Sequence, residues 1–306
     1  MGRQLLSRLW HGLIVIFGVT VIVFVVTRMV GDPVAMMLPL EATAEQRSAF
    51  EHELGFDRPI AVQFGEFVAG AARLDFGDSL WQRRPAMEIV LEKLPATLLL
   101  TFLGIGLAIV LAIPIGIVAA LRPGGGADQF TVSFSLAGLS IPQFWLGLIL
   151  IYLFAVRLHW LPTSGTGTPA HVVLPMITMA LPALARLVMT VRSAMIDELN
   201  QQYARTARAK GLSRFRVVGV HALRNALVPI LTLAGWEVIR ALAGYSVVVE
   251  TVFAWPGLGL ATMQAIERHD LILLQSVVFT VAALVVVTNI ALDAIYQRVD
   301  PRMKLT

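Results

Sequence analysis

The sequence contains no cysteine, and only 14% of its residues are charged whereas 57% are hydrophobic. The absence of cysteine excludes disulfide bonds, thiol catalysis and cysteine-ligated metal sites. Average soluble domains contain about 25% charged residues, so this composition indicates a chain that is largely surrounded by lipid. The 306 residues are therefore better divided into membrane spans than into soluble domains.

The sequence also lacks the motifs of common catalytic sites. It contains no Gly-x-x-x-x-Gly-Lys-Ser/Thr phosphate loop, no His-Glu-x-x-His and no Gly-x-Ser-x-Gly elbow. Six histidines occur singly, without metal-ligand spacing, and are interpreted as hydrogen-bonded structural residues: His11, His52, His159, His171, His221 and His269. We therefore expect no catalytic residue, no metal and no cofactor, and we expect any ATP hydrolysis to come from separate subunits.

Uncharged hydrophobic runs recur along the chain, and about 20 apolar residues suffice to cross a bilayer. Four runs are clear, at residues 9–27, 94–121, 129–156 and 271–292. Two weaker runs contain charges, at 175–191 and 225–250. The sequence thus predicts an all-α integral membrane protein with six transmembrane helices, the first of which is retained rather than cleaved as a signal peptide. Five prolines are expected to bend or break these helices: Pro114, Pro142, Pro175, Pro182 and Pro229.

The distribution of basic residues predicts the orientation. Residues 186–224 hold eight basic and two acidic side chains, and basic residues also precede the first run and follow the last. Residues 31–93, in contrast, hold six basic and eleven acidic residues. Because basic loops stay in the cytoplasm, both termini and residues 186–224 are expected inside, with residues 31–93 outside.

The outer segment has signals of folded structure. Thr43 and Gln46 have capping-box spacing, so a helix is expected at 44–54 with Gly55 as its C-terminal stop.

A second short helix is expected after residues 57–59, with Ile60, Phe64 and Phe67 on one face, and Pro85 is expected to open a third helix. Two interpretations of this outer segment stay open: a scaffold on the outer ends of the spans, or a contact surface for an external partner.

Charged residues inside the fifth run would be costly to place in a membrane without a partner or a polar surrounding. Glu237 and Arg240 are three residues apart, so they can pair on one helix face. Intramembrane charges normally face a bundle interior or a wet cavity, so a structural pair and a pathway-lining pair both remain open. Glu250, at the end of the run, is a further candidate pathway or gate residue.

The segment from Tyr203 to Ser213, YARTARAKGLS, is basic, rich in alanine and set between hydrophobic runs. Arg208 and Lys210 would complement the negative end of a short helix. Gly211 would end it in a left-handed conformation, and Ser213 would cap the next helix. Two short helices at an angle are expected here. They would serve as a docking element for a cytoplasmic protein, although a passive basic loop also fits the charge pattern.

At this point several segments together carry a resemblance. YARTARAKGLS and the following HALRNALVP (221–229) resemble the coupling motif of permease subunits of ABC importers in the dipeptide, oligopeptide and nickel family. Further similar segments follow the family's order: GDP (31–33), LGFDRPI (54–60), DFGDS (75–79), LPAT (94–97) and ETVFAWPGLG (250–259). The chain resembles the half of the permease that has the large first outer loop. The acidic start of the general importer motif is absent, a departure shared with the peptide group.

The resemblance implies roles for individual residues. The ATPase-coupling residues are Tyr203, Arg205, Ala207, Arg208, Lys210, Gly211 and Leu212. The residues that support the coupling loop are His221, Arg224, Asn225 and Pro229.

The resemblance also implies an architecture: the type I ABC-importer transmembrane fold, in the inner membrane of a bacterium. An N-terminal region would span residues 1–95, a core 96–297 with coupling helices at about 195–222, and a cytoplasmic tail 298–306. The implied partners are a second permease subunit in a heterodimer, two ATPases, an extracytoplasmic binding protein and the lipid bilayer, with no nucleic acid. Peptides are the implied substrates, although relatives carry nickel, glutathione, opines or oligosaccharides.

Two other classes of function fit the sequence less well. An ion-coupled secondary transporter or channel would need an acidic or histidine relay at mid-membrane, where only Glu237 is suitably placed. A membrane scaffold or sensor would need a soluble signalling domain, which the sequence does not contain.

Overall fold

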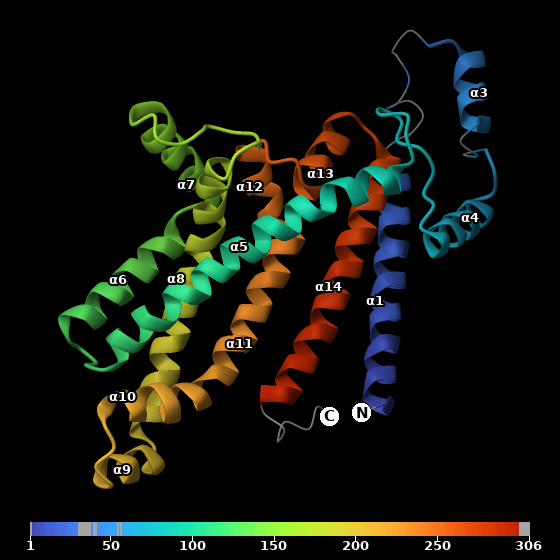
Figure 1. Cartoon of the computed structure of the whole chain (residues 1–306). Coiled ribbons are helices and arrows are strands. Elements are labelled where there is room, and N and C mark those ends of the chain that lie inside the picture. Colours follow the sequence, from blue (N-terminus) through green and yellow to red (C-terminus); the bar gives the residue numbers. More distant parts are fainter. Residues whose placement is uncertain (1, 30–37, 39–41, 54, 56, 300–306) are drawn as a thin grey trace. The chain divides into compact units, whose positions relative to one another are not determined.

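The structure of the chain is a computed structural model that describes residues 2–29, 38, 42–53, 55 and 57–299 (Figure 1). The described residues are mainly helical, and within them the only β pairing is an isolated bridge between Asp78 and Pro85. They form two compact units, residues 1–97 with 256–286 and residues 98–255 with 287–306. The GDP segment and most of the C-terminal tail lie outside the described residues.

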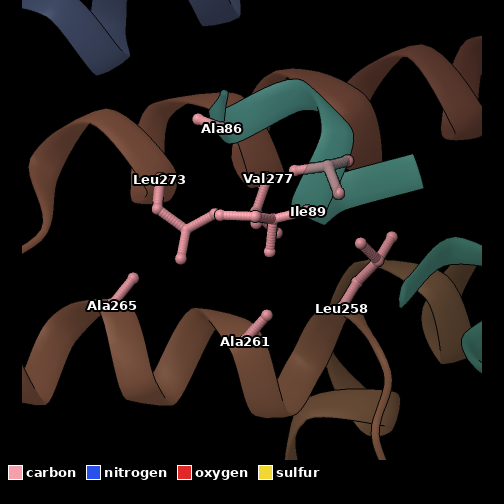
Figure 2. Packing of buried hydrophobic residues seen from close by; sticks show 8 residues of the cluster. Ala86, Ile89, Leu258, Ala261, Ala265, Leu273 and Val277 are labelled. Carbon is pink, nitrogen blue, oxygen red and sulfur yellow. The ribbon is translucent and has the colours of Figure 1, made fainter. Parts of the chain in front are cut away.

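The first unit contains α1 (Gly2–Met29), α3 (Ala44–Glu53), α4 (Ile60–Arg73), the start of α5 (Ala86–Ala120), α13 (Leu258–Glu267) and the first part of α14 (Leu271–Val299). Side chains of α5, α13 and α14 form a buried apolar cluster, in which Ile89, Leu258 and Leu273 are the largest members (Figure 2). The alanines of α13, Ala261 and Ala265, face the cluster and let the helices approach closely.

The expected capping box is confirmed at the start of α3. The backbone N–H of Thr43 donates to the Gln46 side-chain oxygen at 2.9 Å, and the Gln46 N–H donates to the Thr43 hydroxyl at 3.3 Å. The helix ends at Glu53, and Gly55 follows with a φ of 68°, as the stop signal predicts.

The expected second helix is α4, and its aromatic residues pack on α1. The ring of Phe24 lies 5.2 Å from that of Phe64 and 5.6 Å from that of Phe67. Ile60, the first residue of α4, keeps the helical spacing that puts it on the same face as Phe64 and Phe67, but its side chain is 65% exposed.

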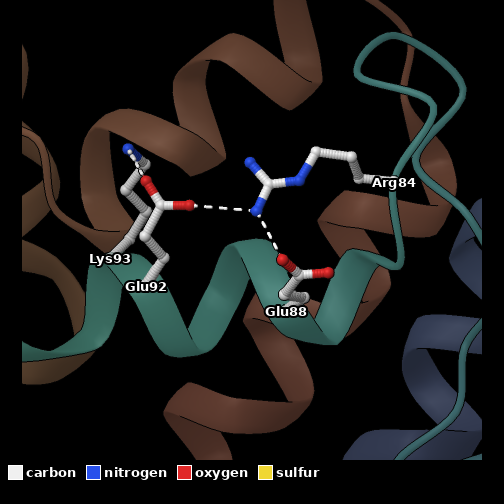
Figure 3. Close-up of polar contacts among 4 residues, drawn as sticks. All are labelled: Arg84, Glu88, Glu92 and Lys93. Carbon is white, nitrogen blue, oxygen red and sulfur yellow. Dashed lines mark hydrogen bonds and ion pairs between the residues drawn. The ribbon is translucent and has the colours of Figure 1, made fainter.

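The third helix expected after Pro85 is continuous with the second hydrophobic run, so α5 is a single helix of 35 residues. On its first turns, Arg84 donates to Glu88 at 2.7 Å and to Glu92 at 3.3 Å, and Lys93 pairs with Glu92 (Figure 3). These exposed pairs neutralise charge at the start of a long apolar helix.

A buried aspartate links the outer segment to α14. The Asp270 carboxylate accepts hydrogen bonds from the Ser79 hydroxyl at 2.5 Å and from the backbone N–H groups of Trp81 and Leu273. It therefore caps α14 and fixes the DFGDS segment at the same time.

The second unit is built around α8 (Ala170–Asn200). Its other elements are the rest of α5, α6 (Gly126–Ser140), α7 (Gln143–Leu150), the π-helix η1 (Ile151–Arg157), α9 (Gln202–Ala209), α10 (Arg214–Arg216), the π-helix η2 (Val217–Ala222), α11 (Leu223–Arg240), the π-helix η3 (Ala241–Tyr245), α12 (Ser246–Val252) and the end of α14. Gly104 and Gly116 of α5 lie against α8, where an added Cβ would come within 2.6 Å of Met179 and Val191 side-chain atoms. Glycine is needed at both positions because the helices are in close contact.

In the part of the chain that the structure describes, five helical segments are long and apolar enough to cross a membrane: Trp10–Thr27, Ala86–Ala120, Ala170–Asn200, Arg214–Val252 and Leu271–Ile295. The remaining expected span is a bent pair, Gly126–Ser140 and Gln143–Arg157, with an angle of 100° between its halves. It counts as a sixth span if the two halves cross together. Pro142 lies at the bend, whereas the helices continue through the other four prolines.

Candidate functional site

The short helix α9 contains most of the residues that the coupling motif predicts. Figure 1 shows it beyond the end of α8, next to α10. Ala204 and Ala207 are its buried positions, whereas Arg205 and Arg208 are exposed. Small residues on the inner face and arginines on the outer face give α9 an amphipathic character suited to lying on its own chain while presenting charge outward.

The end of α9 forms a Schellman motif. Gly211 has a φ of 77°, its N–H donates to the Arg208 carbonyl at 3.0 Å, and the Leu212 N–H donates to the Ala207 carbonyl at 3.2 Å. These two bonds satisfy carbonyls that the helix leaves without an internal partner. The left-handed stop predicted for Gly211 is confirmed. A Cβ at Gly211 would meet no atom within 4 Å, so backbone conformation is the reason for glycine here.

Ser213 caps the next helix, as predicted, because its hydroxyl accepts from the Arg216 N–H at 3.4 Å. The expected second short helix is not separate, however. It starts at Arg214 and continues through η2 into α11, so it is the first turn of a 39-residue helical segment. The segment that follows Ser213 is therefore continuous with a membrane span.

Glu198, near the end of α8, ties α9 to the neighbouring helices. Its Oε2 atom accepts from the Tyr203 hydroxyl at 2.5 Å and from the Asn225 amide of α11 at 3.4 Å. Burial and the hydrogen bond to Glu198 raise the pKa of Tyr203 above its ordinary value, so the phenol stays protonated at neutral pH. A second tie joins the Arg208 guanidinium to the Leu199 carbonyl at 3.1 Å.

The other predicted coupling residues lie at the surface. Lys210 is exposed, and Leu212 is partly buried behind it. Phe215, which lies between two arginines and was not among the predicted residues, is 86% exposed. An aromatic ring this exposed is typical of an interaction surface, and its place in the sequence RFR is the signal that identifies it.

The predicted supporting residues are distributed along η2 and α11. Asn225 contacts Glu198, His221 is partly buried, and Arg224 and Pro229 are exposed. The structure therefore brings Asn225 to the coupling helix.

A cavity of about 510 Å³ lies between α9 and the ends of the spans. Its walls include Ala120 at the end of α5, Leu199 from α8, and Arg208, Arg214 and Val217 from the coupling segment. The short helix thus touches its own chain at defined points and leaves space elsewhere along the contact.

The charges inside the spans form two clusters that join different helices. Glu237 is fully buried and accepts from Arg186 of α8 at 2.7 and 2.8 Å and from Arg240 at 3.3 Å. The predicted pairing of Glu237 with Arg240 is confirmed, whereas Arg186, the stronger partner, was recognised only as an interruption of its hydrophobic run. The carboxylate of Asp128 in α6 pairs with Arg192 of α8, and it too was missed. Glu250 is fully buried. In the described ranges, no group of three or more histidines and carboxylates is placed to hold a metal ion.

The described residues are those of a mainly helical, multi-pass membrane protein with several apolar spans and a charged, rigidly terminated helix beyond them. Residues 112–305 match the model of the family described as "Binding-protein-dependent transport system inner membrane component", and residues 1–101 match the model of that component's N-terminal region. The chain belongs to this family.

Characterised relatives extend over almost the whole chain. The oligopeptide transport system permease protein AppB of Bacillus subtilis is 36% identical, with 99% of this chain and 100% of the relative covered. The di/tripeptide transport system permease protein DppB of Pseudomonas aeruginosa is 39% identical over 94% of both chains. The glutathione transport system permease protein GsiC of Escherichia coli K12 is 34% identical over 99% of both chains.

A solved structure supports the fold. A chain of the inward-facing MetNI methionine ABC transporter superimposes with a TM-score of 0.58 at 23% identity, covering 70% of this chain and 97% of the other. The protein therefore has the type I ABC-importer transmembrane fold. It is the permease component of a binding-protein-dependent importer, a class that works with ATPase and substrate-binding partners.

Proposed function

We propose that this chain forms half of the translocation pathway of a peptide importer that works by alternating access. The feature that carries the proposal is α9 with its Schellman end, because it links an exposed basic surface rigidly to α8 and α11. ATP binding would close two separate ATPases, α9 would move with them, and the pathway would open toward the binding protein.

Coupling would use both faces of α9. The exposed side chains Arg205, Arg208 and Lys210 would contact the ATPase, with Phe215 as an apolar anchor beside them. Ala207, Gly211 and Leu212 would fix the direction of the helix, and Tyr203 would fasten it to α8. Movement would then reach α11 through the continuous segment that begins at Arg214.

His221, Arg224, Asn225 and Pro229 would support the loop from the start of α11. Asn225 does so through its contact with Glu198.

We infer that residues 1–95, 96–297 and 298–306 are an N-terminal region, a transmembrane core and a cytoplasmic tail. Both termini and α9 would face the cytoplasm of a bacterial cell, following the charge bias. The second half of the pathway would be a different permease subunit, in a heterodimer.

Peptides are proposed as substrates because relatives named for oligopeptide and di/tripeptide transport match nearly the full chain. Glutathione, itself a modified tripeptide, is the substrate named for a third relative. Nickel, opines and oligosaccharides are the remaining alternatives. An ion-coupled carrier is disfavoured by the geometry at Glu237, since this carboxylate is occupied by a structural pairing with Arg186 and Arg240.

The direct test is uptake by proteoliposomes that contain this chain, its partner permease and two ATPases, supplied with the cognate binding protein. The proposal predicts ATP-dependent uptake of labelled di- and oligopeptides, and no ATP hydrolysis by this chain alone. Uptake of nickel or an oligosaccharide with no peptide uptake would overturn the substrate assignment. ATP hydrolysis by the purified chain alone would overturn the proposal that separate subunits hydrolyse ATP.

A further inference from the structure

The charges around the buried carboxylate of Glu237 do not sum to zero. One carboxylate faces two guanidinium groups, and Arg186 already makes a two-pronged contact with it at 2.7 and 2.8 Å. Such bidentate pairing is the strongest arrangement available to an arginine and a carboxylate. Arg240 is therefore the surplus cation of the cluster.

Arg240 is also the least engaged of the three residues. Its contact with Glu237 involves a single guanidinium nitrogen at 3.3 Å, and its side chain is 47% exposed. A guanidinium carries five N–H donors and stays protonated in proteins. Within the described residues, Glu237 is the one side chain that hydrogen-bonds or pairs with Arg240, so Arg240 keeps donors for a further partner.

The position of Arg240 restricts what it can face. It lies within the apolar segment Arg214–Val252, on an exposed helix face that it shares with Trp236, which is 54% exposed one turn earlier. Side chains four residues apart are neighbours on a helix. An arginine that is exposed within a span faces water or another polar group rather than lipid tails.

The backbone next to Arg240 is irregular. The π-helix η3 begins directly after it, at Ala241. Single π-helical turns inside α-helices are frequent at functional sites.

We propose that Arg240 binds the terminal carboxylate of a peptide during its passage through the membrane. The planar fork of a guanidinium matches a carboxylate, and Glu237 with Arg186 holds the arginine in place. Trp236 would offer an apolar surface to peptide side chains without selecting among them, because every side chain can pack against an aromatic ring. The net positive charge disfavours a free metal cation. The inference rests on the proposed function, because it names the chemical group of a peptide substrate that this chain would bind.

The test compares each labelled peptide with the same peptide carrying a C-terminal amide, using the assembled transporter in proteoliposomes and saturating binding protein. The peptides are chosen so that the binding protein binds both the free acid and the C-terminal amide. Uptake is expressed as the ratio of variant to wild type for each form, so the preference of the binding protein cancels. We expect Arg240→Gln to lower uptake of the free-acid form about tenfold and that of the amide less than twofold. Arg240→Lys should retain only part of the free-acid uptake, because it keeps the charge but lacks the planar fork.

Arg157→Gln is the matched control. Arg157 is an exposed arginine at the end of η1, far along the sequence from the cluster, where it donates to the Tyr152 hydroxyl at 2.7 Å. It should leave both uptake ratios near one.

The other outcomes count against the inference. Equal losses for acid and amide, or no loss for either, would show that Arg240 does not read the carboxylate. A smaller yield of assembled complex with Arg240→Gln would place the residue at the contact with the partner permease and would also overturn the inference. A wild-type transporter that takes up neither form would instead overturn the proposed function.

Discussion

Glu237 of α11 and Arg186 of α8 are 51 residues apart in sequence, yet both carboxylate oxygens accept hydrogen bonds from the one guanidinium. Glu237 is fully buried, whereas Arg186 keeps 22% of its side chain exposed. The pair joins two spans of the second unit at a point where either charge alone would be costly.

Replacing Arg186 with methionine is therefore expected to destabilise the complex. Glu237 would keep only its weaker contact with Arg240, and breaking a buried pair on one side costs about 3–5 kcal/mol. The measurement is thermal unfolding of the purified complex. The double variant Arg186→Met with Glu237→Leu should recover most of the loss, because no buried carboxylate remains. An Arg186→Met complex as stable as the wild type would contradict this account.

Tyr203 is expected to have a smaller effect, with a recognisable pH dependence. Tyr203→Phe removes a hydrogen bond to Glu198 and should lower stability by about 1 kcal/mol at neutral pH. Because the pKa of Tyr203 is raised in the folded chain, the stability contributed by its protonated form is fully present below the ordinary tyrosine pKa and is lost as the pH rises through the raised value.

Unfolding measured from neutral to alkaline pH should show this loss in the wild type and less of it in Tyr203→Phe. Tyr152→Phe, at an exposed tyrosine, serves as the control. Equal alkaline losses in the wild type and in Tyr203→Phe would argue against the tie between α8 and α9.

The charge bias predicts which side of the membrane each soluble segment faces. Ala49 of α3 and Ala209 at the end of α9 are both exposed, and the chain has no cysteine of its own. Cysteines introduced at these two positions should be labelled from opposite sides by a reagent that does not cross the membrane. Labelling of both from the same side would mean that the assigned number of crossings between them is incorrect.

Features that depend on local chemistry were predictable from sequence. The Thr43–Gln46 capping box, the left-handed Gly211 and the Ser213 cap all involve residues within a few positions of each other, so spacing alone identifies them. The prolines were less informative about helix breaks. Neighbouring helices and side chains can satisfy the backbone groups that a proline leaves without a hydrogen-bond partner. Pro142 accompanies a 100° bend, whereas α8 continues through Pro175 and Pro182.

Features that depend on tertiary contacts were not predictable. Arg186 and Arg192 lie in α8, and their partners, Glu237 and Asp128, lie 51 and 64 residues away. Nothing in a single sequence specifies which distant helix each arginine meets. Ile60 has the spacing of the aromatic face of α4 but is exposed. Periodicity predicts on which side of a helix a residue lies, and it does not predict how far along that side a neighbouring helix covers it.

The central claim is that α9 transmits movement between the ATPases and the spans, and Gly211 tests it most directly. Valine at a φ of 77° introduces a strain of about 1–3 kcal/mol, whereas asparagine tolerates this conformation. Since a Cβ meets no atom within 4 Å, both variants differ from the wild type in backbone strain rather than in a clash.

The measurement is ATP hydrolysis by the reconstituted complex, with and without loaded binding protein, together with peptide uptake. We predict that Gly211→Val inserts normally but loses most uptake and most of the stimulation by loaded binding protein, while Gly211→Asn keeps both. Full uptake and full stimulation in Gly211→Val would contradict the account and would leave this segment as a basic loop that only sets topology.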